Sequence, residues 1–188
     1  MDNIINTLKS YLPPGEGYLP YYMFGLSVIA VGNSLQNYLT LHYSRRLYNG
    51  QFIPNPSLPR KSASFDPEDS TNKLAPAFAT NNTDGNGNGN TNTKDGRTTD
   101  QVTPLAARLF GTYTFVSAVV RLYASYHLHL APVYHMAVWT YVVALFHFAS
   151  EWAVYRTAYL GPPILFPFFF ASVGIVWMTT QYSFYVQA

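Results

Sequence analysis

Residues Pro132 to Tyr155 read PVYHMAVWTYVVALFHFASEWAVY, and their only formal charge is that of Glu151. A helix rises about 1.5 Å per residue, so roughly 20 apolar residues cross the hydrocarbon core of a bilayer. The segment therefore predicts a transmembrane helix. Glu151 is the only acidic residue in any apolar segment of the chain, which predicts that it faces protein or a water-filled cavity and not lipid. His147 lies one helical turn before it on nearly the same face.

Three more apolar segments accompany this one in a chain of 188 residues. Charged residues make up only 11% of the chain and aromatic residues 17%, a balance typical of proteins with many rings at the membrane interface. We predict an all-α fold: a four-span transmembrane helical bundle with one long disordered loop between the first and second spans. The predicted segments are an N-terminal segment 1–18, spans 19–39, 104–126, 132–155 and 163–185, and the loop 40–103.

The long loop differs in composition from the spans. From Pro54 to Asp100 it is rich in Pro, Ser, Asn, Gly, Thr and Asp, and it ends in NNTDGNGNGNTNTKDGRTTD. Such a segment buries too little apolar surface to offset its conformational entropy, which predicts disorder.

Basic residues predict the orientation of the spans. The turn between the second and third spans, His127 to Ala131, holds no Lys or Arg, whereas the long loop holds Arg45, Arg46, Arg60, Lys61, Lys73, Lys94 and Arg97. Because cytoplasmic loops carry an excess of Lys and Arg, we predict a cytosolic loop and lumenal termini. The sequon that begins at Asn81 provides a test, since a glycan there would place the loop in the lumen.

Several functional classes are excluded by composition. The chain has no cysteine, so it has neither a disulfide framework nor a thiolate metal site. A net charge of +2 is too small and too dispersed to indicate nucleic-acid binding. The histidines are scattered, and only His135 and His147 lie within spans, about three helical turns apart. Membrane di-iron enzymes need clustered histidines and more ligands, so we predict neither a metal site nor a cofactor.

Polar side chains inside the spans are the candidate functional residues. Asn33, Gln36 and Asn37 fall at positions i, i+3 and i+4, so they form a polar stripe on one face of the first span. Amides in hydrocarbon need hydrogen-bond partners on neighbouring helices. The stripe therefore predicts either contacts between the chain's own spans or a docking surface for the spans of a partner.

The second and third spans are separated by a turn of five residues, His127 to Ala131, which predicts a tight antiparallel hairpin. If the turn centres near residues 129–130, Arg108 lies opposite Glu151 and Thr112 lies opposite His147. One interpretation is structural: Glu151 pairs with Arg108, and His147 bonds Thr112 or a backbone carbonyl. The alternative is catalytic, with His147 and Glu151 transferring a proton on a lipid substrate.

Arg121, the other basic residue of the second span, lies opposite Val138 and Trp139 in the same register. We expect its guanidinium to lie near Trp139 or to reach the interface, and not to bind a substrate.

Five stretches together carry a resemblance to a known family: GYLPYYMF, VGNSLQNY, LAARLFGTYTFVSAVVRLYASY, YVVALFHFASEWAVYRTAYLG and ASVGIVWMTTQYSFY. The chain resembles the ergosterol biosynthetic protein 28 family over residues 17–50 and 104–185. The family's pattern carries over at Gly32 or its neighbours, and at Asn33, Gln36, Arg108, Phe110, Gly111, Thr112, Arg121, His147, Glu151, Arg156 and Trp177. No catalytic role comes with these residues. The chain departs from the pattern in its Asn/Gly-rich insertion and in a C-terminal end without basic residues.

The resemblance implies a multi-pass protein of the endoplasmic reticulum membrane that is a scaffold and not an enzyme. It implies that the chain holds the sterol C4-methyl oxidase, the C4-carboxylate dehydrogenase/decarboxylase and the 3-keto reductase together, with the sterol C24-methyltransferase also linked to it. The polar stripe would then be a docking surface. A sterol isomerase-type enzyme and a sterol-binding module remain as alternatives, and self-association stays open.

Overall fold

The computed structural model describes residues 10–54, 74–76 and 101–186. Four long helices and two short ones account for most of these residues. The helices and strands are α2 (Leu19–Leu39), α3 (His42–Leu47), β1 (Phe52–Pro54), β2 (Leu74–Pro76), α4 (Pro104–Tyr126), α5 (Ala131–Ala153), α6 (Pro162–Thr180) and α7 (Tyr182–Tyr185).

Proline lies in the first or second position of each long helix, because its fixed φ suits the first turn and its missing N–H is not needed there. In α4 the side chain of Thr103 also caps the helix by accepting a hydrogen bond of 3.1 Å from the backbone N–H of Ala106. The last predicted span, 163–185, is divided in the structure. Helix α6 ends at Thr180, and α7 follows after Gln181, whose backbone (φ −113°, ψ 22°) leaves the helical region.

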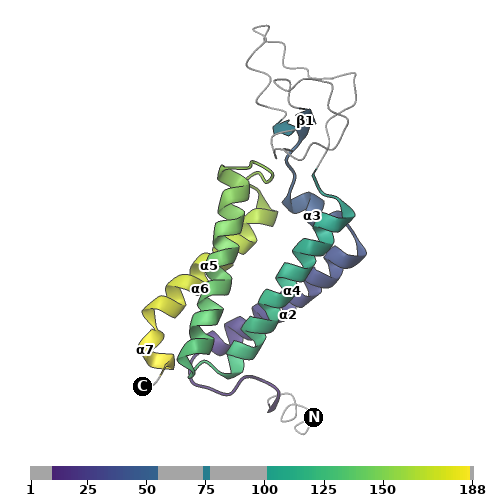
Figure 1. The fold of residues 1–188 in the computed structure, drawn as a ribbon. Coiled ribbons are helices and arrows are strands. Elements are labelled where there is room, and N and C mark those ends of the chain that lie inside the picture. The colour runs from purple at the N-terminus through teal and green to yellow at the C-terminus, as the bar shows by residue number, and fades with distance from the viewer. Residues whose placement is uncertain (1–9, 55–73, 77–100, 187–188) are drawn as a thin grey trace.

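The long helices pack as two pairs. Helix α2 lies along α4, and α5 lies along α6, whereas α4 and α5 contact each other less extensively (Figure 1). Helices α4 and α5 are consecutive and joined by a short turn, but α4 packs mainly on α2 and α5 packs mainly on α6. The predicted hairpin therefore exists as a connection without being the main packing unit.

Small residues allow the close approach of α2 and α4. Gly111 is buried against Tyr38, and a Cβ added at Gly111 would lie 3.0 Å from the tyrosine ring and 3.2 Å from Cβ of Asn37. The hydroxyl of Ser34 donates a hydrogen bond of 2.7 Å to the carbonyl oxygen of Gly111. Small residues and hydroxyl-to-carbonyl bonds of this kind hold helices together in membranes, where lipid is as apolar as the side chains.

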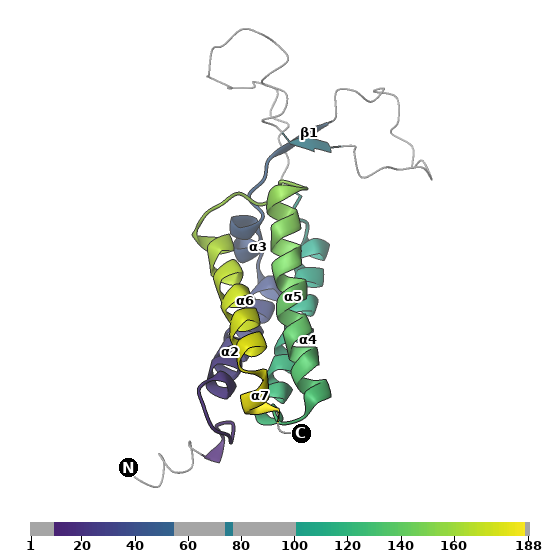
Figure 2. The same cartoon turned by 90° about the vertical axis from the view of Figure 1, so that its left-hand side faces the viewer.

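Both described ends of the chain lie at one end of the bundle, and α3 with the β1–β2 hairpin lies at the other (Figures 1 and 2). At the terminal end the backbone N–H of Leu19 donates to the hydroxyl of Tyr185 at 3.3 Å. The buried Tyr134 of α5 donates to the carbonyl oxygen of Met178 in α6 at 2.7 Å. These bonds join α2 to α7 and α5 to α6.

Three helices of the described part of the chain are long and apolar enough to cross a membrane: α4, α5 and α6. The predicted all-α fold is thus confirmed, and three of the four predicted spans are candidate membrane spans. Helix α2 occupies the residues of the first predicted span but does not reach the same hydropathy. Its serines, amides and tyrosines account for the difference.

The predicted disordered loop 40–103 is wrong near its start and at residues 74–76. Residues His42–Leu47 form α3, and β1 pairs antiparallel with β2, Phe52 opposite Pro76. Helix α3 is ordered because Leu47, 1% exposed, packs with Phe148 and Ile164 of α5 and α6. The remainder of the predicted loop, with the sequon at Asn81, lies outside the described residues.

Candidate functional site

The imidazole of His147 lies at the centre of a polar cluster near the α3 end of the bundle. Its Nε2 is 2.6 Å from the hydroxyl of Tyr48, and its Nδ1 is 3.9 Å from Oε1 of Glu151. The other carboxylate oxygen of Glu151 accepts a hydrogen bond from the hydroxyl of Thr157. One imidazole and one carboxylate are therefore both bound by side chains of the same chain.

The proton positions in this cluster follow from the environment of Tyr48. Burial raises the pKa of the Tyr48 hydroxyl above its usual range, and the nearby carboxylate of Glu151 raises it further. The phenol thus keeps its proton and is able to donate it to Nε2 of His147. With the phenol as donor, neutral imidazole accepts at Nε2 and carries its ring proton on Nδ1, on the side of Glu151.

Chain segments on both sides of the cluster hold it in place. The backbone N–H of Gly50 donates to the carbonyl oxygen of Thr157 at 2.8 Å, and that of Tyr159 donates to the side chain of Asn49 at 2.9 Å. The backbone N–H of Thr157 donates to the carbonyl oxygen of Glu151 at 3.0 Å. The segment after α3 is thus tied to the connection between α5 and α6.

A cavity of about 430 Å³ adjoins the cluster. Its polar lining includes Tyr48, His147, Glu151 and Thr157, and most of the remaining wall is apolar and includes the ring of Phe110. The ring of Phe110 stacks on the imidazole at a centroid distance of 6.2 Å. In size and lining the cavity resembles small-molecule sites in general, which makes the cluster a candidate functional site.

The predicted pairing of Glu151 with Arg108 and of His147 with Thr112 is wrong. Arg108 is exposed, and the hydroxyl of Thr112 lies 2.5 Å from that of Tyr38 on α2. The hairpin register gives residues of equal depth but not the direction in which they point. Because α4 packs mainly on α2, its polar residues face α2 at this level and not α5.

The predicted polar stripe is divided among three environments. Asn37 is buried: its amide nitrogen donates to the carbonyl oxygen of Asn33 at 2.8 Å, and its amide oxygen accepts from Ser44 at 2.5 Å. Asn33 lines a second cavity, and Gln36 is exposed. The expectation of one continuous docking surface is therefore wrong for Asn37, because that side chain joins α2 to α3.

The expectation that Arg121 lies near Trp139 is wrong, because its partners are Thr140 and Tyr141. Its Nε donates to the hydroxyl of Thr140 at 2.8 Å, its Nη2 donates to the carbonyl oxygen of Thr140 at 3.0 Å, and its guanidinium carbon lies 4.2 Å from the ring centre of Tyr141. The expected contact of a cation with an aromatic ring is thus present, but with the ring two positions later in α5. Trp139 points outward and is 65% exposed.

Sequence reasoning missed three members of these sites. Tyr48 was hidden in the segment predicted to be disordered, and Thr157 lies between two predicted spans. Tyr141 was one tyrosine among many in an apolar helix. Among residues 10–54, 74–76 and 101–186, no group of three or more His, Cys, Asp or Glu side chains could hold a metal ion.

Replacing Tyr48 by phenylalanine should lower the free energy of unfolding by about 0.5–1.5 kcal/mol, because the variant loses the hydrogen bond to His147. Unfolding by SDS titration in mixed micelles measures the change. Tyr155→Phe is the matched control, since Tyr155 is 59% exposed. Equal unfolding midpoints for the two variants would show that the Tyr48–His147 bond does not stabilise the fold.

Comparison with known proteins gives consistent matches over most of the chain. A family model described as "Erg28 like protein" matches residues 19–176. The ergosterol biosynthetic protein 28 of Gibberella zeae is 51% identical over 183 residues, which cover 97% of this chain and 99% of that protein. The protein of the same name from Saccharomyces cerevisiae is 27% identical over 187 residues, 98% of this chain and 95% of that protein. A human homologue is 40% identical over 77 residues, 41% of this chain and 55% of that protein. No solved structure matches the chain.

Proposed function

We propose a function that starts from one fact: this chain belongs to the Erg28 family. In this proposal the chain is a non-catalytic scaffold for sterol C4-demethylation. The chain is a homologue of proteins of ergosterol biosynthesis, and it carries several candidate membrane spans. In the proposed role it holds the C4-methyl oxidase, the C4-carboxylate dehydrogenase/decarboxylase and the 3-keto reductase as neighbours in the endoplasmic reticulum membrane. The C24-methyltransferase is a further proposed partner.

In this proposal α2 is a fourth span. Its 21 residues give a length of about 31 Å, which matches a hydrocarbon core of about 30 Å. The helix carries no formal charge, and it runs beside α4, which is itself a candidate span (Figure 1). Of its buried polar side chains, Ser34 bonds to α4 and Asn37 to α3, while Ser27 bonds to a carbonyl oxygen within α2. Four spans place both termini on the same side, and the basic residues of the long loop favour the lumen for the termini.

The bonding of His147 and Glu151 is the observation that best supports a role without catalysis. Tyr48 binds one ring nitrogen of His147, and Thr157 binds the carboxylate of Glu151. A general acid or base must come within hydrogen-bond distance of the atom that it protonates or deprotonates, and these bonds direct both groups toward their own chain. Here His147 and Glu151, the side chains that could serve as general acid or base, hold the segment after α3, helix α5 and the α5–α6 connection together.

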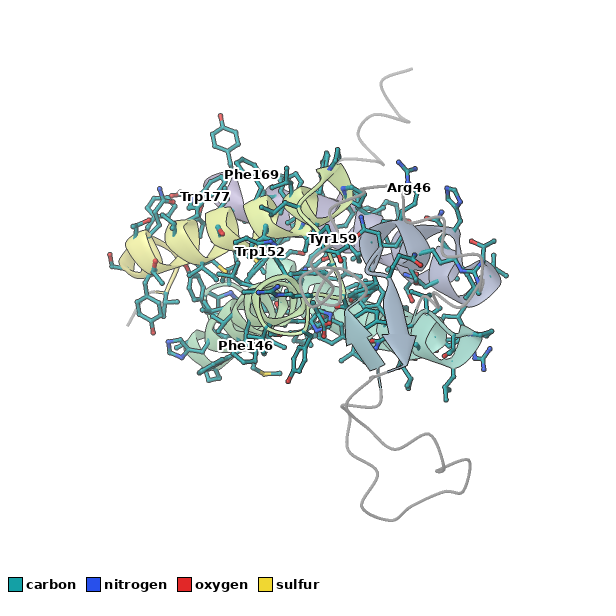
Figure 3. The ribbon with its side chains drawn as sticks, turned by 90° about the horizontal axis from the view of Figure 1, so that it is seen from above. Arg46, Phe146, Trp152, Tyr159, Phe169 and Trp177 are labelled. Carbon is teal, nitrogen blue, oxygen red and sulfur yellow. The ribbon has the colours of Figure 1, made fainter. Side chains whose placement is uncertain are left out.

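The outer surface offers large apolar areas to lipid and to partner helices. Phe146 on α5 is 74% exposed and Phe169 on α6 is 63% exposed, and both lie on the outside of the bundle (Figure 3). On α2 the side chains of Leu35 and Leu39 are also exposed, next to Gln36. An exposed amide within an apolar helix face is a suitable contact for a polar side chain of a partner span.

The benefit of a scaffold is kinetic. Enzymes that act in succession on poorly soluble sterols otherwise depend on diffusion of each intermediate through the membrane. Holding them together raises the effective concentration of each enzyme near the product of the previous one, to the millimolar range for short tethers. Loss of the scaffold should therefore lower flux through several different enzymes at once.

Replacing Glu151 by glutamine separates the scaffold from a proton-transfer enzyme. In a strain without its own copy of the gene, a stably expressed Glu151→Gln chain should restore roughly wild-type sterol composition, because glutamine keeps a hydrogen-bond acceptor for Thr157. Removal of a general acid or base would instead lower turnover by about 10²–10⁴-fold. Sterol analysis by mass spectrometry measures the outcome. An empty-vector strain sets the baseline, and failure of the variant at wild-type protein levels would favour the enzyme.

A further inference from the structure

The second cavity lies between the two helix pairs, within the part of the bundle that all four long helices share. It has a volume of about 230 Å³ and is partly open. Most of its wall is apolar, formed by Leu26, Ile29, Ala30, Phe148, Phe166 and Phe170. Its polar lining includes Arg121, Tyr113 and Tyr141. The cavity is therefore apolar with a small group of polar atoms, the arrangement that binding sites for small amphipathic molecules have.

The charge of Arg121 has no acidic partner in the described structure. Among the described residues, Glu151 lies beside His147 and not beside Arg121. Glu151 lies eleven positions after Thr140, the residue that binds the guanidinium, so it is more than about 15 Å away along α5. A cation at membrane depth without a counter-charge is unfavourable, and it normally indicates a functional site.

The guanidinium of Arg121 is held inside the bundle instead of reaching the interface. Two of its five N–H groups bind the hydroxyl and the carbonyl oxygen of Thr140. The Thr140 hydroxyl itself donates to the carbonyl oxygen of Ala137 at 2.7 Å, so it can act only as an acceptor toward Arg121. The two bonds to Thr140 fix the orientation of the guanidinium, and its remaining N–H groups stay available to a ligand.

Two phenol hydroxyls on the same cavity have no hydrogen-bond partner. The hydroxyl of Tyr141 is buried without a partner in a side chain that is only 1% exposed. The hydroxyl of Tyr113 is also unpartnered, with Ser117 as a polar neighbour. Tyr141 cannot move away easily, because its ring lies against Gly174, where an added Cβ would come within 3.0 Å of it. Buried polar groups normally find partners, so these hydroxyls point to a missing one.

We propose that this cavity binds the carboxylate end of an amphipathic lipid. A carboxylate accepts several hydrogen bonds and carries the charge that Arg121 lacks, and it can accept from the phenols at the same time. The cavity is smaller than the roughly 300–1,000 Å³ of sites for whole drug-sized ligands, so it holds one end of the lipid while the rest extends into the bilayer.

The source of the carboxylate is a sterol acid, a choice that rests on the proposed function. Oxidation of a ring methyl group yields a carboxylate, and a decarboxylase consumes it, so this intermediate must pass between two of the proposed partner enzymes. A scaffold that binds it would retain it between the two steps. Neutral sterols before and after that stage lack the charge that Arg121 recognises.

The test uses the full chain in nanodiscs of phosphatidylcholine and a radiolabelled 3β-hydroxysterol-4α-carboxylic acid. Wild-type protein should bind this probe saturably and at least about tenfold more tightly than the matched 4α-methyl sterol, and palmitate should compete poorly. Arg121→Gln should weaken binding of the acid about ten- to hundredfold, the loss of a hydrogen bond to a charged group, without changing the affinity for the 4α-methyl sterol comparably. Arg46→Gln, at an exposed position of α3, is the matched charge control.

Further variants keep the test valid if Arg121→Gln fails to fold. Tyr141→Phe removes only the hydroxyl and should weaken acid binding, and Ala30→Leu fills the cavity and should weaken it without altering any charge. Equal binding of the acid and the methyl sterol, retained selectivity in Arg121→Gln, or full competition by palmitate would overturn the proposal. Recovery of the partner enzymes with a wild-type chain that binds no acid would contradict this site alone. Acid binding without recovery of any enzyme would contradict the scaffold alone.

Discussion

Replacing Tyr134 by alanine should lower the free energy of unfolding by about 3–5 kcal/mol, the cost of truncating a buried aromatic side chain. Tyr134 is fully buried in α5, and its ring packs edge-on against Tyr182 at 5.3 Å and stacks with Tyr185 at 6.5 Å. Its hydroxyl binds the carbonyl oxygen of Met178. Truncation leaves a cavity and an unbound carbonyl between α5, α6 and α7. SDS titration of the purified chain in mixed micelles gives the free energy.

Two controls separate packing from hydrogen bonding at Tyr134. Tyr134→Phe keeps the ring and should cost only about 0.5–1.5 kcal/mol. Tyr155→Ala removes a tyrosine that is 59% exposed and should change stability by no more than about 0.5 kcal/mol. If Tyr134→Ala unfolds at the same SDS fraction as Tyr155→Ala, the terminal end of the bundle is not packed as described.

Replacing Gly111 by leucine should separate α2 from α4. A leucine has no space there, since even its Cβ would lie 3.0 Å from the ring of Tyr38 and 3.2 Å from Cβ of Asn37. Overpacking costs about 1–3 kcal/mol and occasionally more, and we expect the upper end because the contact includes the buried Asn37. The same variant should weaken the bond from Ser34 to the carbonyl of residue 111.

Gly32→Leu provides a control for which the expected change in stability has the opposite sign. Gly32 lies in α2, and an added Cβ would meet nothing within 4 Å. Leucine has a better helix propensity than glycine by up to about 1 kcal/mol, so this variant should be neutral or more stable. The measurement is the SDS unfolding midpoint of each variant together with its yield from membranes. A destabilisation as large at Gly32 as at Gly111 would contradict the close α2–α4 contact.

The helices could be predicted from the sequence because the apolar segments are long enough to cross a bilayer and each has a proline in its first turn. Helix α4 begins at Pro104 after the capping Thr103, as the sequence indicates. The pairing of helices could not be predicted in this way. Periodicity identifies the apolar or polar face of a helix but not the helix on which that face packs, and for that reason Arg108 was assigned to Glu151 incorrectly.

The sites were predictable only in part for a related reason. His147 and Glu151 are recognisable as polar residues one turn apart in an apolar helix. Their partner Tyr48 follows a six-residue helix in a region whose overall composition is polar, and its order depends on packing against α5 and α6. For Arg121, successive residues of a helix point about 100° apart, so a small error in the assumed register replaced Tyr141 by Trp139.

Quantitative mass spectrometry of the proteins that co-purify with the tagged full-length chain tests the central claim most directly. The chain is extracted from its native membranes in a mild detergent and compared with an unrelated tagged multi-pass protein at equal abundance. The scaffold predicts strong enrichment of the sterol C4-methyl oxidase, the C4-carboxylate dehydrogenase/decarboxylase and the 3-keto reductase together. Recovery of all three at the level of the unrelated protein would contradict it.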